Sequence, residues 1–269
     1  MKEFKILAVG DIVGTCGIYA LEKKLDKIIE DNNIDFVIAN GENAAMGSGL
    51  DKRSYERLKK LNIDCITMGN HTWGKKEIFD FIDGSNIIRP YNLPKNIPGK
   101  GYMIFEKEGK KIAVVNMIGR VAINVLSDNP FLVMEKLLNK LKEVDYIIVD
   151  FHGEATAEKI AFARYFDGKI SAIFGTHTHV QTADNEILEK NTGYITDIGM
   201  TGSQSGVIGM QKEVAYKRFI KTLPERYSLA PDDKNYIMGA IYTFDEDSKK
   251  CIDVSRLQYD IRKNKYIVR

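Results

Sequence analysis

Apolar runs alternate with amphipathic stretches over the first two thirds of the chain. Six short β-branched runs are apolar on both faces, as buried strands are. These predicted strands cover residues 4–9, 36–40, 65–68, 112–116, 146–151 and 172–175. Five stretches between them carry apolar residues at three-and-four spacing, with Lys and Glu on the opposite face, which predicts helices. The predicted helices cover residues 18–30, 52–61, 75–83, 131–141 and 155–166. This alternation indicates a layered α/β fold.

The last third of the chain follows a different pattern. Residues 237–244 and 251–259 predict an antiparallel pair joined by a polar turn. Residues 101–106 and 111–116 predict a similar hairpin, so the sheets should be mixed rather than purely parallel. No repeat, low-complexity tract or Pro/Gly-rich linker divides the chain. We therefore predict one domain over residues 1–269, with 199–210 as a long mobile loop.

Composition is that of a soluble globular protein, with 44% apolar and 28% charged residues. A net charge of +2 is too small to indicate a nucleic-acid groove or an anionic membrane surface. The N-terminal apolar run, 6–9, is too short for a signal peptide or a spanning helix. Cys16, Cys65 and Cys251 are scattered and form no CxxC pair, which indicates core thiols and a reducing cytoplasm. Alternating Lys and Glu along 21–30 and 131–143 are typical of solvated helix faces.

All four histidines lie in short polar segments that follow apolar runs, and two carboxylate-bearing segments have the same setting. Imidazole is the commonest metal ligand, and Asp, Glu and Asn oxygens complete sites for hard or borderline cations. In open α/β sheets, ligands bind beyond the carboxyl ends of the strands, so five strands should deliver these groups to one rim. The candidate ligands are Asp11, Glu42, Asn43, Asn70, His152, His177 and His179, with His71 beside Asn70.

The spacing of the candidates favours two ions. In an extended segment, His177 and His179 point the same way, about 6.5–7 Å apart. Two metals about 3.5–4 Å apart could each take one of these imidazoles. Seven ligands are too many for one four-coordinate zinc and suit two ions that share Glu42. His71 is then left for acid–base work. A glycine precedes Asp11, Glu42, Asn70 and Thr176, which fits tight turns where the backbone passes close to an ion.

Each candidate also has a structural alternative. A single histidine is commonly a half-buried hydrogen-bonding residue. Asp11 and Asn70 could cap the following helices, and Asn43 could orient a ligand rather than bind. The glycines at 47–49 and 202–206 could cradle phosphate, but surface turns are their commoner role. Trp73 could stack on a base, although packing in the core or at the rim is the safer interpretation. Arg120 could clamp a phosphate, although a solvated surface position is the commoner one. No G-x-G-x-x-G or Gly-Lys-Ser/Thr pattern occurs, so no organic cofactor is expected.

The motifs GD near the start, GNH in the middle and GTHTH near residue 179 resemble those of the calcineurin-like metallophosphoesterases. The chain departs from the general pattern at three places. Val13 replaces the histidine of the first motif, Glu42 replaces the bridging Asp, and Thr72 replaces the Asp that follows GNH. These departures match the bacterial YmdB-like subfamily, whose pattern looks like GDIVG, NGENAA, ITMGNHTW, DFHGEAT, GTHTHVQTAD and ITDIGMTG. The resemblance extends from Gly10 to Gly202.

The resemblance implies a four-layer α/β/β/α sandwich with two mixed sheets. It implies that the first metal is bound by Asp11, Glu42, Asn43 and His179. The second would be bound by Glu42, Asn70, His152 and His177, with His71 as proton donor. Two ions per chain are implied, with iron first and manganese or zinc as alternatives. A site with mostly oxygen donors on the first metal fits iron or manganese better than zinc.

The resemblance also implies a function. We expect a dinuclear metal-dependent phosphodiesterase that hydrolyses small phosphodiesters, 2′,3′-cyclic nucleotides above all, by attack of a metal-bound hydroxide. The alternatives are a phosphomonoesterase or nucleotidase, and a metal-binding regulatory protein. The expected partner is a small-molecule substrate, with no stable nucleic-acid binding and no membrane association. The oligomeric state stays open, with a homo-oligomer favoured.

Overall fold

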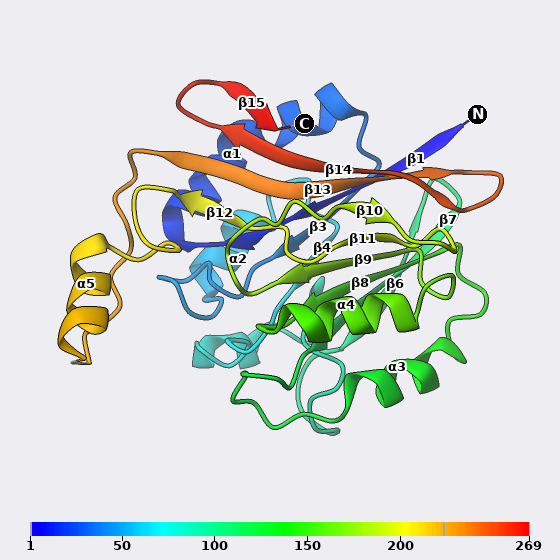
Figure 1. Ribbon diagram of the computed structural model, residues 1–269, viewed down its shortest axis with the longest axis horizontal. Coiled ribbons are helices and arrows are strands. Elements are labelled where there is room, and N and C mark those ends of the chain that lie inside the picture. The colour runs from blue at the N-terminus through cyan, green and yellow to red at the C-terminus, as the bar shows by residue number, and fades with distance from the viewer. Residues whose placement is uncertain (1, 223, 269) are drawn as a thin grey trace.

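Two mixed β-sheets form the centre of the computed structural model, which describes residues 2–222 and 224–268 (Figure 1). The first sheet has the order β15 (Lys265–Val268), β14 (Cys251–Asp260), β13 (Asn235–Asp245), β1 (Glu3–Val9), β3 (Phe36–Asn40), β4 (Cys65–Thr67) and β5 (Ile87–Ile88). Two short strands, β2 (Asp11–Ile12) and β12 (Met200–Ser203), join it at one end. The second sheet has the order β10 (Glu186–Ile187), β11 (Gly193–Ile195), β9 (Ala172–Thr176), β8 (Tyr146–His152), β7 (Lys110–Ile118) and β6 (Tyr102–Lys107).

Each sheet combines a run of four parallel strands with antiparallel strands: on one side of the run in the first sheet and on both sides in the second. Strands β1, β3, β4 and β5 are parallel, and so are β7, β8, β9 and β11. The hairpins β13–β14 and β6–β7 are antiparallel, at the two places where the sequence predicts them. The predicted α/β class with two mixed sheets is therefore confirmed. Because parallel strands end at the same edge, this topology collects the segments after β1, β3, β4, β8 and β9.

The helices are α1 (Gly14–Asn32), α2 (Lys52–Leu58), α3 (Pro130–Leu138), α4 (Thr156–Tyr165) and α5 (Lys212–Lys221). Helices α1 to α4 lie where amphipathic stretches predict them. The stretch at 75–83 contains only a five-residue 3₁₀ helix, Lys76–Asp80, so the predicted α-helix there is wrong. A 3₁₀ segment of this length is a connector rather than a packing element.

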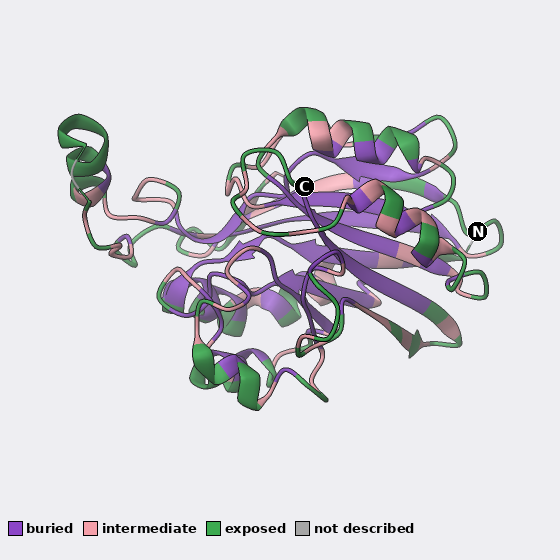
Figure 2. Ribbon diagram, turned by 90° about the horizontal axis from the view of Figure 1, so that it is seen from below, coloured by how far each residue is buried: buried purple, intermediate pink, exposed green. Residues whose placement is uncertain are grey.

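Alternation along the strands divides the apolar core into separate clusters. On β1, Phe4 and Ile6 join strand residues of the second sheet, and the Phe4 ring stacks on Tyr146 of β8 with centroids 5.2 Å apart. Leu7, the residue after Ile6, joins a cluster with the buried face of α1. On β8, Val149 points to a third cluster that includes α3 and α4. Successive strand residues face opposite sides of the sheet. A strand that is apolar on both faces therefore packs against two layers, one on each side (Figure 2).

Two predictions in the last third are wrong or incomplete. The predicted loop at 199–210 includes strand β12, whose Met200 pairs with Asp11 and whose Gly202 pairs with Tyr236. Helix α5 has no counterpart among the predicted helices. It buries only Ala215 and projects from the body in both views (Figures 1 and 2). Helix α5 buries too few residues to show a strong apolar pattern, and β12 depends on strand partners that are distant in sequence.

The three cysteines are buried and free, as predicted. Burial raises the pKa of each thiol: well above its usual value for Cys65 and to about 12 for Cys251, with a smaller rise for Cys16. Within residues 2–222 and 224–268, no helix is long and apolar enough to cross a membrane.

Candidate metal centre

The polar segments at the carboxyl ends of both sheets meet in one cluster. The first sheet contributes Asp11 after β1, Glu42 and Asn43 after β3, and Asn70 and His71 after β4. The second sheet contributes His152 at the end of β8, and His177 and His179 after β9. All eight residues that the sequence selects are connected by contacts of 3.7 Å or less.

One half of the cluster surrounds Nε2 of His152. This nitrogen lies 2.8 Å from Oδ1 of Asn70, 3.2 Å from Oε1 of Glu42 and 3.1 Å from Nδ1 of His177. Glu42, His152 and His177 offer ligand atoms that all lie within 4.8 Å of one another. Three groups with lone pairs thus converge on Nε2 of His152, which donates its proton among them. A cation in place of that proton would have four ligands.

The other half surrounds Nδ2 of Asn43. This amide nitrogen lies 3.4 Å from Oδ1 of Asp11, 3.3 Å from Oε1 of Glu42 and 3.1 Å from Nε2 of His179. Here too a hydrogen-bond donor, Nδ2 of Asn43, lies among three groups that can accept. For Asn43 to bind a cation through Oδ1, its amide would have to turn by half a rotation, since Oδ1 now faces Nδ1 of His71 at 2.8 Å. Oε1 of Glu42 belongs to both halves.

Charge in this cluster is dense and buried. The carboxylates of Asp11 and Glu42 are 0% and 1% exposed. Burial raises the pKa of Asp11. Burial also opposes the charge of Glu42, but the positive His152 and hydrogen bonds from His152 and His71 outweigh it and hold the pKa of Glu42 well below its usual value. Two buried carboxylates need positive partners: the charges of His179 and His152 act on Asp11, and those of His152 and His71 act on Glu42.

The two histidines of the half around Nε2 of His152, which are His152 and His177, differ in charge. Burial opposes the charge of His152, yet Glu42 and Asp11 raise its pKa to about 9. Burial and the positive His152 lower the pKa of His177 to about 3, so His177 is neutral near pH 7. Its Nε2 lies 3.1 Å from Oε2 of Glu154, which directs Nδ1 into the cluster. A neutral, oriented imidazole is the form that binds metals.

His71 lies at the rim of the cluster and is 40% exposed. Its backbone N–H donates to Oε2 of Glu42 at 3.0 Å, and its Nδ1 faces Asn43. Among the described residues, Nε2 of His71 has no hydrogen-bond partner. Thr72 does not contact this ring: its hydroxyl donates to the carbonyl of Gly69 at 2.6 Å. Asn43 therefore orients His71, a role that sequence analysis does not reveal.

A buried carboxylate, Asp150 of β8, joins the two sheets beneath the cluster. Its Oδ2 accepts hydrogen bonds from Asn40 of β3 at 3.1 Å and from Thr67 of β4 at 2.5 Å. Its Oδ1 accepts from the hydroxyl of Thr176 at 2.6 Å, and Oγ1 of Thr176 lies 2.8 Å from Nδ1 of His152. Since the Thr176 proton goes to Asp150, Thr176 accepts the Nδ1 proton of His152. This relay leaves Nε2 as the nitrogen directed into the cluster.

A buried ion pair holds the loop that carries the twin histidines. The ammonium of Lys159 in α4 donates to Oδ2 of Asp197 and to the carbonyl of Thr176, at 2.8 and 2.9 Å. Asp197 also accepts from the backbone of Thr178 at 3.1 Å. His177 and His179 have φ angles of 102° and 65°, a region that non-glycine residues rarely occupy. Such a backbone persists only where its surroundings fix it, as this pair does.

Sequence analysis missed Asp150, Thr176, Lys159 and Asp197. The available signal was an Asp inside an otherwise apolar strand, which is costly to bury unless it is hydrogen-bonded. Lys159 gave no signal, because a lysine on a helix is normally solvated.

The glycines before the candidate ligands serve close packing rather than tight turns. A Cβ on Gly69 would lie 2.3 Å from Oε2 of Glu42 and 2.4 Å from the His152 ring. A Cβ on Gly175 would lie 1.8 Å from the carbonyl oxygen of Thr196. Neither glycine has a positive φ. These positions lack a side chain because neighbouring groups occupy its volume.

The structural alternatives are resolved for several residues. Helix α1 begins after Val13 without a side-chain cap, and Asp11 instead accepts from the backbone of His177 at 3.2 Å. The helix-capping alternative for Asp11 is therefore wrong. Trp73 stacks on Phe79 with centroids 5.0 Å apart, which is the rim-packing alternative. Arg120 is exposed.

Comparison with known proteins gives one consistent family. The family model described as YmdB-like protein matches residues 7–257. The 2′,3′-cyclic-nucleotide 2′-phosphodiesterase of Bacillus subtilis (strain 168) is 46% identical over 255 residues, 94% of this chain and 96% of that protein. The crystal structure of a novel phosphatase from Mycoplasma pneumoniae has a TM-score of 0.91 at 35% identity and covers 97% of this chain and 94% of its own.

A more distant structure shares the fold alone. The NAD nucleotidase of Haemophilus influenzae has a TM-score of 0.59 at 13% identity, and the match covers all of this chain and 60% of that protein. The motifs, the two-sheet architecture and the family match agree. The chain belongs to the YmdB-like family of calcineurin-like metallophosphoesterases.

Proposed function

We propose that this chain is a dinuclear metal-dependent phosphodiesterase whose substrates are 2′,3′-cyclic nucleotides. Support for the substrate class comes from the relative in Bacillus subtilis, which matches almost end to end. Support for two ions comes from the cluster itself. Asp11, Glu42, Asn43 and His179 would hold the first ion, and Glu42, Asn70, His152 and His177 the second.

The single observation that carries this proposal is the position of Glu42. Its Oε1 lies 3.2 Å from Nε2 of His152 and 3.3 Å from Nδ2 of Asn43, the central donors of the two halves. A carboxylate shared in this way fits a bridge between two cations. Two positive ions would also balance the buried charge of Asp11 and Glu42, which His152 balances only by keeping a proton.

The donor set favours iron or manganese. The first group contains one imidazole with carboxylate and amide oxygens, and neither group contains a thiolate. Oxygen-rich sites with few nitrogens suit Mn and Fe, whereas closed structural zinc sites are built mainly from Cys and His. When bound, the ions would act as Lewis acids that lower the pKa of water and screen the charge of a phosphate.

The residues around the ions would position the substrate and move one proton. His71 presents Nε2 at the rim, and Nδ1 of its ring faces Oδ1 of Asn43 at 2.8 Å; with the amide turned so that Oδ1 binds the first ion, Nδ2 of Asn43 would contact Nδ1 instead. From this position His71 would protonate the ribose oxygen that leaves phosphorus, a contribution of about 10²–10⁴-fold. A five-membered cyclic phosphate is strained and needs little help with its leaving group. The absence of an acidic partner at Thr72 is consistent with such a substrate.

The second candidate function is a phosphomonoesterase or nucleotidase. The observation that favours it is the exposed rim at His71, which would admit a terminal phosphate as readily as a cyclic one. Parallel assays separate the two candidates. We expect 2′,3′-cyclic AMP to be turned over faster than AMP and faster than a generic phosphodiester.

Elemental analysis of the purified protein, alongside these assays, tests the proposal. About two ions per chain together with hydrolysis of the cyclic ester is the expected result. Full activity in protein from which chelators have removed every metal would overturn the proposal. Faster turnover of AMP than of the cyclic ester would favour the second candidate.

A further inference from the structure

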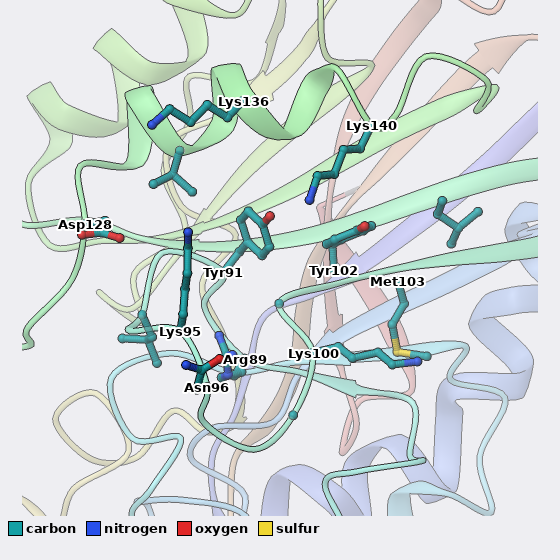
Figure 3. A pocket seen from close by; sticks show the side chains of 15 residues that line it. Arg89, Tyr91, Lys95, Asn96, Lys100, Tyr102, Met103, Asp128, Lys136 and Lys140 are labelled. Atoms are coloured by element: carbon teal, nitrogen blue, oxygen red, sulfur yellow. The ribbon is translucent and has the colours of Figure 1, made fainter.

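A second concave site lies at the open edge of the second sheet. A cavity of about 1010 Å³ is lined by residues of β6, of the segment 89–101 and of α3 with the turn that follows it (Figure 3). Strand β6 is the last strand of its sheet, so its outer edge faces this space. None of the eight residues of the candidate metal centre lines it. We call this site the basic pocket.

Positive charge is concentrated in the basic pocket. Its lining contains the cationic residues Arg89, Lys95, Lys100, Lys136 and Lys140 against a single carboxylate, Asp128. The whole chain is nearly balanced, with 39 Lys and Arg against 37 Asp and Glu, so this excess is local. Like charges gathered in one concavity produce a positive potential that attracts anions.

The four lysines of the basic pocket are available to a ligand. All four are exposed, and among the described residues none of their ammonium groups has an ion pair or a hydrogen bond to a protein group. Figure 3 shows Lys95 rising from the segment 89–101 and Lys140 descending from the end of α3, on opposite sides of the same space. Such lysines bind phosphates as mobile point charges.

Arg89 has a different role from the lysines. It is only 8% exposed, and its guanidinium donates to the carbonyls of Pro98 and Pro90 at 3.0 and 2.9 Å. These bonds tie the beginning of the segment 89–101, which carries Lys95, to a residue near its end. Asn92 then fixes this segment to the second sheet, with Nδ2 donating to the carbonyl of Ile118 at 2.8 Å. One wall of the basic pocket is therefore a fixed segment rather than a loose loop.

Aromatic rings lie between the lysines. Tyr91 and Tyr102 pack edge to face with centroids 5.5 Å apart and planes at 85° (Figure 3). Leu93, Met103 and Val133 add apolar surface to the lining. Ring and charge together match a ligand that combines a flat, largely apolar group with several negative charges.

We propose that the basic pocket binds a nucleotide that carries several phosphates, at a site separate from the metal centre. The lysines bind the phosphate chain, and the base lies against Tyr91 and Tyr102. The cavity has the size of small-molecule sites, at the upper end of about 300–1,000 Å³. A single-stranded nucleic acid would need a longer basic groove with repeated stacking rings, whereas the charge here is confined to one pocket.

Calorimetry with ATP tests this site in the full chain as purified. A second titration in EDTA removes binding that depends on metal ions, so a failure of the metal-centre proposal does not affect the result. We expect ATP to bind in both titrations. The probe tripolyphosphate reports the lysines alone, and we expect its affinity to be about tenfold weaker than that of ATP because base stacking is lost.

Two matched double variants locate the binding. Lys136→Gln with Lys140→Gln removes two charges at the end of α3, and Lys59→Gln with Lys60→Gln removes two exposed charges at the end of α2, outside the basic pocket. We expect ATP affinity to fall at least about tenfold in the first and to change less than about twofold in the second, because charge-assisted bonds are short-ranged at physiological salt.

Four results would overturn the proposal. They are no ATP binding in EDTA, equal losses in the two double variants, equal affinities for ATP and tripolyphosphate, and tighter binding of a single-stranded oligoribonucleotide than of ATP. A loss in Lys95→Gln with Lys100→Gln that matches the α3 pair would support it, since those two lysines also line the basic pocket, outside α3.

Discussion

The two halves of the metal centre are supported by different parts of the fold. His152 is 0% exposed and rests on Thr176 and Asp150, which are themselves buried between the sheets. His179 is held at Nδ1 by a main-chain carbonyl, that of Ile208, at 3.0 Å. Ile208 lies in the irregular segment between β12 and α5. One half is therefore fixed by sheet side chains and the other by a loop.

This contrast shows how a single cluster can combine rigid and adaptable support. Groups fixed by packed strands lose little entropy when they bind a ligand, whereas a loop must be ordered first. We expect the half around His152 to bind its cation more tightly than the half around His179.

Glu42→Gln should have the largest effect, because Glu42 belongs to both halves. The amide keeps the size of the side chain but removes the buried charge that two cations would share. We expect both ions to be lost or greatly weakened and turnover of 2′,3′-cyclic AMP to fall by about 10³-fold or more. Elemental analysis and steady-state assays measure the two effects. Two tightly bound ions in this variant would contradict a shared carboxylate.

His71→Ala should affect turnover without affecting either half. The ring contacts Asn43 and Glu42 from the rim and is not one of the proposed ligands. We expect turnover to fall by about 10²-fold while the metal content stays at the wild-type value. A substrate with a better leaving group should recover much of the loss. Unchanged turnover of the cyclic ester would refute the role of His71 as proton donor.

Thr176→Val should weaken one half selectively. The substitution keeps the shape but removes the hydroxyl that accepts from His152 and donates to Asp150. We expect the affinity of one ion to fall by about 10–100-fold, with little change in the other. Titration against a competing chelator resolves the two ions. Thr176→Ser keeps the hydroxyl and should restore the affinity; equal weakening of both ions would show that the halves are not independent.

The thiols provide the smallest effect and a control for the other variants. Burial raises the pKa of Cys251 to about 12 and that of Cys65 well above its usual value. Because the thiolate is the reactive form, only about one part in 10⁴ of Cys251 is reactive at pH 8. We expect Ellman's reagent to find no reactive thiol in the native protein and three after denaturation. If the three thiols of the Thr176→Val variant are as unreactive in the native state as those of the wild type, the effect of that substitution on metal affinity is local.

The prediction of the fold succeeded where periodicity is strong. The buried strands β3 and β8 and the amphipathic helix α1 bury whole faces, so their own residues reveal them. Helix α5 escaped prediction because it buries little more than Ala215. Strand β12 escaped because its pairing partners, at Asp11 and Tyr236, lie far away in the sequence.

The sequence by itself determined the α/β class, the family and the residues that converge at the strand ends. Those features follow from local periodicity and from short motifs with unusual chemistry. The tertiary structure alone decided the bond from Asp150 across the sheets, the pair of Lys159 with Asp197 and the gathering of lysines in the basic pocket. In the sequence only Asp150 stands out, as a carboxylate in an apolar strand, whereas the lysines lie on helix faces and in a loop and look solvated. Their meaning depends on neighbours from distant segments, and a single chain position carries no record of those neighbours until the sheets have packed.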